Sequence, residues 1–335
     1  GGPVGSSMPT LCTGSHHVDG LAVADDGQIA VVASALTGEL WDGRLLLLRH
    51  EPGSEAASVS VSIPTASGNT AVLWAAPGLV ASGDDVGDVT LWRFAAGVSA
   101  ATTEATLPCA TYREHEQPVT CLASAPRGLR LASGSKDGTV KIWANDSIVQ
   151  TESSLIHTSP DPWCDVGISG IAFRGPDSVV SVAADGLIRL WDLRASTPAV
   201  RCVSHEAMGL CSVASIDETL LVAGTQAGAV ICVDWRGGAG GAVTQRLALD
   251  RGPVRALCPA PGAAQAAAPL IAAAHDSGNA TVFNARSLDV CGSVAGHEDR
   301  MSAVGWIGPP QGKQVTIVSG GWDKRVCSHA LLLTA

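Results

Sequence analysis

Short runs of alternating apolar and polar residues, separated by turns rich in glycine, extend along the whole sequence. In the segment 115–143 this alternation predicts three short strands, at 118–123, 130–134 and 139–143. The turn Lys136-Asp137-Gly138 between the last two is a typical hairpin signal. No stretch sustains a helical apolar period for three turns, so the pattern predicts an all-β protein.

The three-strand pattern recurs seven times. With position 143 as a phase marker, equivalent positions lie between 42 and 51 residues apart, close to the roughly 40–45 residues of one propeller blade. The markers are Leu48, Trp92, Trp143, Trp191, Val233, Phe283 and His329. The turns that precede them are Asp42-Gly43, Val86-Gly87, Asp137-Gly138, Asp185-Gly186, Ala227-Gly228, Ser277-Gly278 and Asp323-Lys324. These repeats fill the chain and predict one seven-bladed β-propeller.

Four polar residues occupy fixed offsets in the best-preserved repeat: His115, Ser133, Asp137 and Trp143. In this order they resemble the WD repeat, whose polar groups hydrogen-bond inside a blade. A buried polar group without a partner costs about 1–3 kcal/mol, so such a network fixes one strand arrangement. Other repeats keep part of the set, namely Asp185, Trp191, His297, Ser319 and Asp323. We therefore expect a structural role for all of these residues.

The repeats also indicate the domain limits. We expect residues 8–335 to form a single propeller and residues 1–7 to be a cloning remnant ahead of Met8. The residues after the last marker, 330–335, are too few for a separate outer strand. The segment 8–16 is therefore expected to supply that strand and close the ring, because closure removes exposed sheet edges.

Charge and composition narrow the classes of partner. The formal net charge is −10, from 21 basic and 31 acidic residues, which argues against direct nucleic-acid binding and favours basic partners. Acidic clusters lie at predicted strand ends, at Asp84-Asp85 with Asp88, Glu114 with Glu116, and Glu298-Asp299. No apolar run reaches transmembrane length, so no membrane partner is expected. The ten cysteines include no Cys-x-x-Cys pair, which favours buried free thiols in a reducing compartment.

Common catalytic motifs do not occur in the sequence. It has no Gly-x-Ser-x-Gly, no Gly-x-x-x-x-Gly-Lys and no His-Glu-x-x-His. His16-His17 could hold a metal, but spacing places no third ligand beside them, and a surface pair is the simpler interpretation. We expect neither an enzyme nor a cofactor or metal site.

Three stretches resemble the methylosome protein 50 family, the WD-repeat subunit of the type II (symmetric) protein arginine methyltransferase complex. They are 34–45, which contains Trp41, 79–92, and the last repeat from His297 to Val326. In the last repeat, Trp322 precedes the turn aspartate and the usual strand-end tryptophan is absent, as in that family. The resemblance spans all seven repeats, is loose in the fifth and sixth, and departs at 259–269.

This resemblance implies a non-catalytic adaptor. In the family, the propeller docks on the N-terminal barrel domain of the methyltransferase, largely through blade 1 loops, and helps present histone or Sm-type substrate tails. A hetero-oligomer in the cytoplasm and nucleus is therefore expected. Trp41, on a connection between two strands, is the expected anchor, because hot spots are often large aromatic residues that fill a partner's pocket. Leu40, Asp42 and Arg44 flank it; the alternative is that Trp41 folds back over its own blade.

Two other classes of function stay open. The sequence Trp191-Asp192-Leu193-Arg194 matches the Trp-Asp-x-Arg ending found in WD-repeat substrate receptors of cullin-type ubiquitin ligases. The same ending is common in WD repeats generally. A generic protein-interaction scaffold with unrelated partners is the third possibility.

Overall fold

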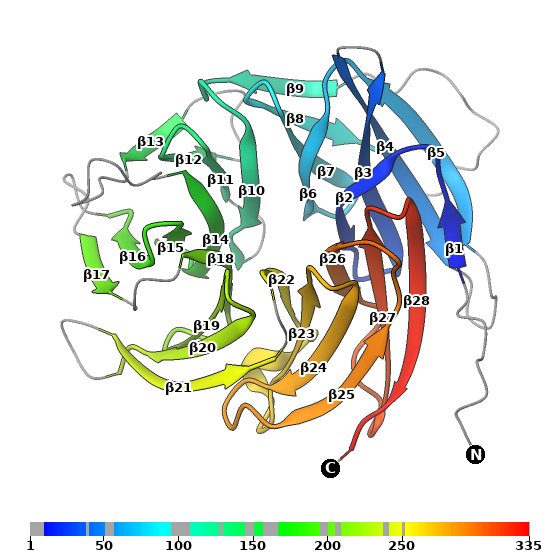
Figure 1. Ribbon diagram of the computed structural model, residues 1–335. Coiled ribbons are helices and arrows are strands. Elements are labelled where there is room, and N and C mark those ends of the chain that lie inside the picture. Colours follow the sequence, from blue (N-terminus) through cyan, green and yellow to red (C-terminus); the bar gives the residue numbers. More distant parts are fainter. Residues whose placement is uncertain are drawn as a thin grey trace, which may run out of the picture.

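Seven four-stranded antiparallel sheets are arranged in a ring in the computed structural model (Figure 1). The structure describes residues 10–37, 40–50, 57–94, 108–126, 130–144, 151–156, 167–194, 200–204, 209–236, 241–249 and 252–334. No α-helix occurs in these ranges. The predicted all-β, seven-bladed propeller is therefore confirmed.

In the first four blades, strands follow one another in sequence from the channel outwards. Blade 1 contains β2 (His17–Val23), β3 (Gln28–Thr37), β4 (Leu40–His50) and β5 (Ala57–Thr65). Blade 2 contains β6 (Asn69–Ala76), β7 (Leu79–Asp84), β8 (Asp88–Arg93) and β9 (Pro108–Arg113). Blade 3 contains β10 (Val119–Ser124), β11 (Arg130–Ser135), β12 (Thr139–Ala144) and β13 (Thr151–Ile156). Blade 4 contains β14 (Ile168–Gly175), β15 (Ser178–Ala183), β16 (Leu187–Asp192) and β17 (Val200–Ser204).

The remaining three blades complete the ring. Blade 5 contains β18 (Leu210–Ser215), β19 (Leu220–Thr225), β20 (Ala229–Asp234) and β21 (Ala242–Ala248). Blade 6 contains β22 (Val254–Pro259), the 3-10 turn η2 (Ala263–Gln265), β23 (Leu270–His275), β24 (Asn279–Asn284) and β25 (Val290–Ala295). Blade 7 contains β26 (Met301–Trp306), β27 (Gln314–Gly321), β28 (Arg325–Leu332) and, as its outermost strand, β1 (Thr10–Thr13).

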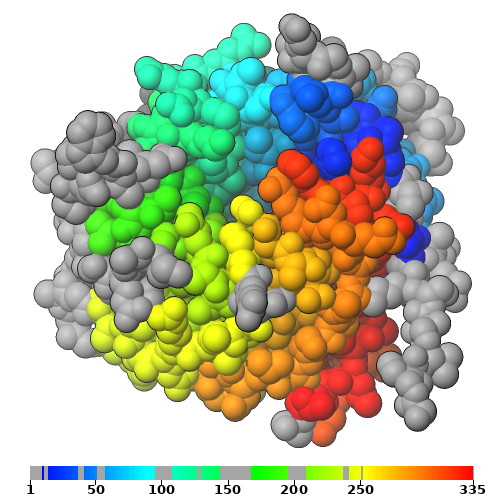
Figure 2. Space-filling model, in the orientation of Figure 1, coloured from blue at the N-terminus to red at the C-terminus, as the bar shows by residue number. Residues whose placement is uncertain are grey.

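The strand β1 closes the ring as the sequence predicts. Thr13 pairs with Arg325 and Cys12 with Val326, antiparallel to β28. Figure 2 shows the first and last parts of the chain packed side by side. The last blade therefore takes strands from both ends of the described chain, which covers the edge that β28 would otherwise expose.

Six of the seven phase markers lie opposite the second residue of the preceding strand, and His329 lies opposite Ile317, the fourth residue of the longer β27. Trp143 faces Leu131, Trp191 faces Val179, and in blade 5, which lacks the tryptophan, Val233 faces Leu221. Core clusters form between neighbouring sheets. One of them joins Val180 and Ile188 of blade 4 to Leu210, Leu221 and Ile231 of blade 5, among other residues. Stacking of thin, Ala- and Val-rich sheets thus buries the apolar residues that the sequence alternation identifies.

The prediction for blade 1 is wrong in one respect. Trp41 does not lie on a connection, because β3 and β4 continue to Thr37 and Leu40 and pair Trp41 with Leu36. Gly43 likewise lies within β4, opposite Ser34, and not in a turn. A Cβ atom there would collide with Ser67, Asn69 and Thr65. The glycine therefore permits a close approach of blade 2, whereas Gly138 and its counterparts have the positive φ that a tight turn requires.

Candidate partner-binding face

The blade 3 residues identified from the sequence form one continuous hydrogen-bond network. The indole N–H of Trp143 donates to Ser133 Oγ at 3.0 Å, and Ser133 Oγ lies 2.8 Å from His115 Nε2. His115 Nδ1 lies 2.9 Å from Asp137 Oδ2. Buried hydrogen bonds therefore connect the segment before β10, the strands β11 and β12, and the turn between them.

The pKa values show how this network is charged. Burial lowers the pKa of His115, although Asp137 opposes that effect. A neutral imidazole then donates from Nδ1 to Asp137 and accepts the Ser133 hydroxyl at Nε2. Burial alone would raise the pKa of Asp137, but hydrogen bonds from the side chain and backbone of Thr139 and from the Glu116 backbone bring it below its usual value. Asp137 is thus a satisfied structural carboxylate.

Blade 7 builds the same network without tryptophan. His297 lies 2.8 Å from both Asp323 and Ser319, and His329 Nε2 lies 2.7 Å from Ser319 Oγ. Burial, followed by the nearby His297, lowers the pKa of His329 to about 4. Neutral His329 can therefore donate N–H to Ser319 where the other blades use an indole.

In blade 4 the turn aspartate binds an arginine, whereas in blades 3 and 7 it binds a histidine. Trp191 donates to Ser181 at 2.7 Å, as in blade 3. Asp185 binds Arg189 Nη2 at 2.7 Å, and both side chains are only 3% exposed. The expected histidine, His157, lies outside the described residues. Burial removes the hydration of both ions, and the attraction between Asp185 and Arg189 offsets that cost.

The residues predicted to bind a partner lie on β4 but do not share one face. Side chains alternate across a strand, so Trp41 and Asp42 point in opposite directions. Trp41 and Asp85 both lie close to Gly68, on the blade 2 side of the hairpin. Asp42 lies 3.6 Å from His16 Nε2, and Arg44 donates to Ser62 of β5. Leu40 pairs with Thr37 through the backbone, and its side chain is outside the described part.

Exposed apolar side chains occur on the β3–β4 hairpin of blade 1 and on the β7–β8 turn of blade 2. The side chains of Leu36, Trp41 and Val86 are 58%, 39% and 60% exposed. Leu36 is the direct cross-strand neighbour of Trp41, and Val86 occupies the equivalent turn of blade 2, next to Asp85. Burial raises the pKa of Asp84 and Asp85, and Asp84 raises the pKa of Asp85 further. We call Leu36, Trp41 and Val86 the hairpin patch; it combines apolar anchors with neighbouring carboxylates.

Beside the hairpin patch, the inner strands share a feature that the sequence analysis missed. Each inner strand has a β-bulge or register irregularity near its start, at the second residue in six strands and at the third residue in β2, and all seven such residues line the mouth of the central channel. They are Asp19, Thr70, Thr120, Ser169, Cys211, Arg255 and Ser302. A polar residue in this place is visible in six of the seven repeats, so the sequence does contain the signal.

Hydroxyl groups at these irregular positions join neighbouring blades. Thr120 donates to the carbonyl oxygen of Ile168 at 2.6 Å, Ser169 to that of Leu210 at 2.6 Å, and Ser302 to that of Val18 at 2.5 Å. Each acceptor belongs to the next blade. Asp19 and Arg255 replace the hydroxyl by a charged group in blades 1 and 6, and both side chains line the channel mouth.

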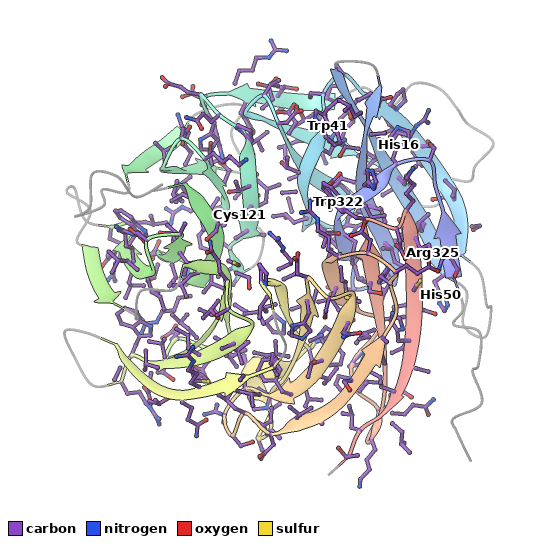
Figure 3. The ribbon with its side chains drawn as sticks, viewed as in Figure 1. His16, Trp41, His50, Cys121, Trp322 and Arg325 are labelled. Carbon is purple, nitrogen blue, oxygen red and sulfur yellow. The ribbon has the colours of Figure 1, made fainter. Side chains whose placement is uncertain are left out.

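A cluster at the seam of blades 7 and 1 covers one side of this mouth. The His17 and Trp322 rings stack with their centroids 4.9 Å apart, and His17 Nδ1 lies 2.6 Å from the Trp322 carbonyl oxygen. Asp19 accepts hydrogen bonds from Ser34 and Trp322, and burial raises its pKa to about 6. Figure 3 shows Trp41 and His16 on the same side of the ring as Trp322. The two histidines thus contact different partners, Asp42 and Trp322.

The acidic clusters predicted at strand ends are only partly available for a partner. Asp84 accepts from Ser67 and from two backbone N–H groups. Asp88 pairs with Arg113, Glu114 with Lys141, and Glu298 with Arg325. These contacts lower the net attraction of the face for a basic peptide, although the surface pairs are weak.

The Trp191-Asp192-Leu193-Arg194 ending forms a local clasp at the opposite end of its blade. Arg194 binds Asp192 through Nε and Nη2, at 2.9 and 2.7 Å. Arg236 binds Asp234 in the same way in blade 5. Because the clasp recurs where no Trp-Asp-x-Arg sequence occurs, its geometry reflects the strand-end turn and does not favour a ligase adaptor.

Among the described residues, no group of three or more His, Cys, Asp or Glu side chains is placed to hold a metal ion. The described residues contain no helix that is long and apolar enough to cross a membrane. The seven cysteines whose side chains are described are free. Burial raises the pKa of the Cys121 and Cys258 thiols to about 12, so these thiols are protonated and unreactive at neutral pH.

The seven blades and their His, Ser, Asp and Trp networks define the fold of this chain as a WD-repeat β-propeller. The sequence profile described as "WD domain, G-beta repeat" matches residues 107–144, the blade that retains all four polar positions. The chain also matches the crystal structure of the WD40 β-propeller domain of Doa1 with a TM-score of 0.73 and 16% identity, over 95% of this chain and 94% of that one.

Among curated proteins, the chain is similar to the "Methylosome protein WDR77" of Xenopus laevis. The two are 25% identical over 311 residues, which is 91% of this chain and 87% of the relative. A second relative, "Ribosome biogenesis protein WDR12 homolog" of Chlamydomonas reinhardtii, is 28% identical over 64% of this chain and 52% of its own length. The resemblance to the methylosome WD-repeat proteins thus extends over nearly the whole propeller, as the sequence motifs indicate.

Proposed function

We propose that this WD-repeat protein is a non-catalytic adaptor that binds a type II protein arginine methyltransferase through the β3–β4 hairpin. The observation that carries the proposal is the hairpin patch. Trp41 is held on a paired strand and not on a loose loop, yet its side chain remains substantially exposed. A rigid aromatic residue loses little conformational entropy on binding, which makes it an efficient anchor.

The surroundings of Trp41 favour binding to a partner over packing of Trp41 against its own blade. Its cross-strand neighbour Leu36 is also exposed, so the hairpin leaves two apolar side chains in contact with water. The likeness to a methylosome protein over 91% of the chain supports the identity of the proposed partner. Asp85, which lies with Trp41 close to Gly68, adds an acidic group that fits substrates with basic tails of the histone or Sm type.

A titration of the purified chain with a purified type II methyltransferase tests this function. We expect saturable binding with Kd of about 1 μM or tighter, as for a specific hetero-oligomer. A folded chain that shows no binding at tens of micromolar would exclude the proposed partner. The expected cytoplasmic and nuclear location belongs to the same proposal, and fractionation with the methyltransferase as marker tests it.

A further inference from the structure

A second cluster of charged groups lies at the channel mouth, on the side of blades 6 and 7. Arg300 immediately precedes β26, and its Cζ atom lies 3.3 Å from the centroid of the Trp322 ring. Stacking engages the flat face of a guanidinium and leaves the N–H donors at its edge. Within the described part of the chain, no oxygen accepts a hydrogen bond from this guanidinium.

A second guanidinium faces the same space. Arg255 occupies the irregular second position of β22, where four other blades have a serine or threonine hydroxyl. Asp276 Oδ1 accepts from Arg255 Nε at 2.7 Å, which orients the side chain and leaves its terminal nitrogens for another acceptor. Burial, and then the charge of Arg255, lower the pKa of Arg300. Two guanidinium groups thus line one cavity, and each has N–H groups that donate to no acceptor among the contacts described above.

The nearby carboxylates are engaged elsewhere. Asp19 accepts from Ser34 and Trp322, and Asp276 binds Arg255. Asp299 accepts from the backbone N–H of Arg300 at 2.6 Å. Each of these groups attracts Arg300 from a distance, but none of them supplies the planar pair of acceptors that a guanidinium edge matches best.

We propose that Arg255 and Arg300 together bind an anionic side chain, a carboxylate or phosphate, inserted into the channel mouth by a partner peptide. The cavity has a volume of about 620 Å³ and is lined by residues from all seven blades, so it admits side chains but not a folded domain. The protein carries a net charge of −10, so long-range attraction does not deliver the ligand. Recognition therefore depends on short-range, charge-assisted hydrogen bonds. Trp41 lines the same cavity on the blade 1 side, whereas the donors of this site belong to blades 6 and 7, so the proposal does not rest on docking through Trp41.

Short peptides of the form Gly-Gly-Ser-X-Ser-Gly-Gly, with phosphoserine, glutamate or glutamine at X, test the site by saturation-transfer NMR. The phosphoserine or glutamate peptide should bind, and the glutamine peptide should not. Preference for phosphoserine over glutamate by about tenfold would identify phosphate as the ligand, and equal binding would identify any carboxylate-sized anion.

Variants of the full chain show whether the two arginines are responsible. Arg300→Gln and Arg255→Gln should each weaken binding by about tenfold or more. Arg325→Gln is the matched control, since Arg325 lies on β28 (Figure 3), is paired with Glu298, and loses the same charge; its affinity should stay within about twofold. If Arg300→Gln does not fold by circular dichroism, Arg255→Gln decides. Equal binding of the glutamine peptide, unchanged affinity in folded variants, or no binding at about 10 mM peptide would overturn the proposal.

Discussion

At the scale of single residues, one buried serine in each of four blades connects an aromatic donor to the rest of its repeat. Ser82 accepts from Trp92 at 2.9 Å, and Ser133 and Ser181 accept from their tryptophans in the same way. In blade 7 the donor is His329. The serine hydroxyl has one donor and two acceptor sites, so it can join an indole or imidazole on one side to a histidine on the other.

Replacement of Asp137 by alanine should strand His115 and the backbone N–H groups of Glu116 and Thr139, all of which now bind its carboxylate. We expect Asp137→Ala to lower the free energy of unfolding by about 1–3 kcal/mol. Urea denaturation measures this loss. Asp25→Ala, at an exposed turn position, is the control and should change stability by less than about 0.5 kcal/mol. Equal stability of both variants would show that Asp137 is a simple turn residue.

His329 makes stability depend on pH. Its pKa is about 4 in the folded protein and 6.5 in an unfolded chain, so the unfolded state gains its proton first as the pH falls. The stability that depends on neutral His329 is fully present above pH 6.5 and is lost as the pH falls from 6.5 to about 4. The difference corresponds to roughly 3 kcal/mol.

The variant His329→Gln keeps a donor for Ser319 but does not titrate. Denaturant melts at pH 7 and pH 4 should show a smaller loss of stability for the variant than for the natural chain. If both lose the same amount, His329 is already protonated in the folded protein or exchanges its partner.

At the scale of elements, the sequence predicts strands well wherever a repeat obeys its period. The strands of blade 3 agree with their predicted ranges within one or two residues, and closure by the N-terminal segment is confirmed by the pairing of Thr13 with Arg325. The hairpin of blade 1 was not predictable in the same way. Asp42-Gly43 resembles the turn of blade 3, but Gly43 is needed for the close approach of blade 2, a tertiary requirement that no local pattern reveals.

The channel mouth was missed for a different reason. The polar residue at the irregular position is present in the sequence of six of the seven inner strands, but its function depends on backbone irregularity and on the carbonyl groups of the next blade. Arg300 and Trp322 come from different connections of blade 7 and meet only in the folded ring. Pairings of this kind follow from ring geometry and not from spacing along the chain.

Removal of β1 tests the closure of the ring. A chain that starts at Gly14 lacks the partner of β28, which then presents unpaired N–H and C=O groups. We expect a melting temperature lower than that of a chain starting at Thr10, together with self-association visible by light scattering. Identical melting and a purely monomeric truncated chain would show that β1 is dispensable.

At the scale of the whole molecule, the net charge of −10 favours basic tails as ligands of the proposed adaptor. Attraction between exposed charges is screened beyond about 8 Å at physiological salt. Binding of an Arg- and Lys-rich histone-tail peptide should therefore weaken steeply as salt rises, and a peptide with these residues replaced by glutamine should not bind. Absence of binding at low salt would count against presentation of substrates by this propeller.

The hairpin patch is the surface through which we propose that the propeller binds the methyltransferase. Calorimetric titration of a purified type II methyltransferase with the natural chain, Trp41→Ala and Leu332→Ala measures its contribution. Leu332 is 76% exposed and lies at the end of β28, so its variant controls for the loss of an exposed apolar side chain. Thermal melts of all three chains should nearly coincide, because Trp41 is a surface residue. Trp41→Ala should weaken binding by about 2 kcal/mol or more, while Leu332→Ala binds like the natural chain; unchanged affinity of a folded Trp41→Ala would contradict docking through the hairpin.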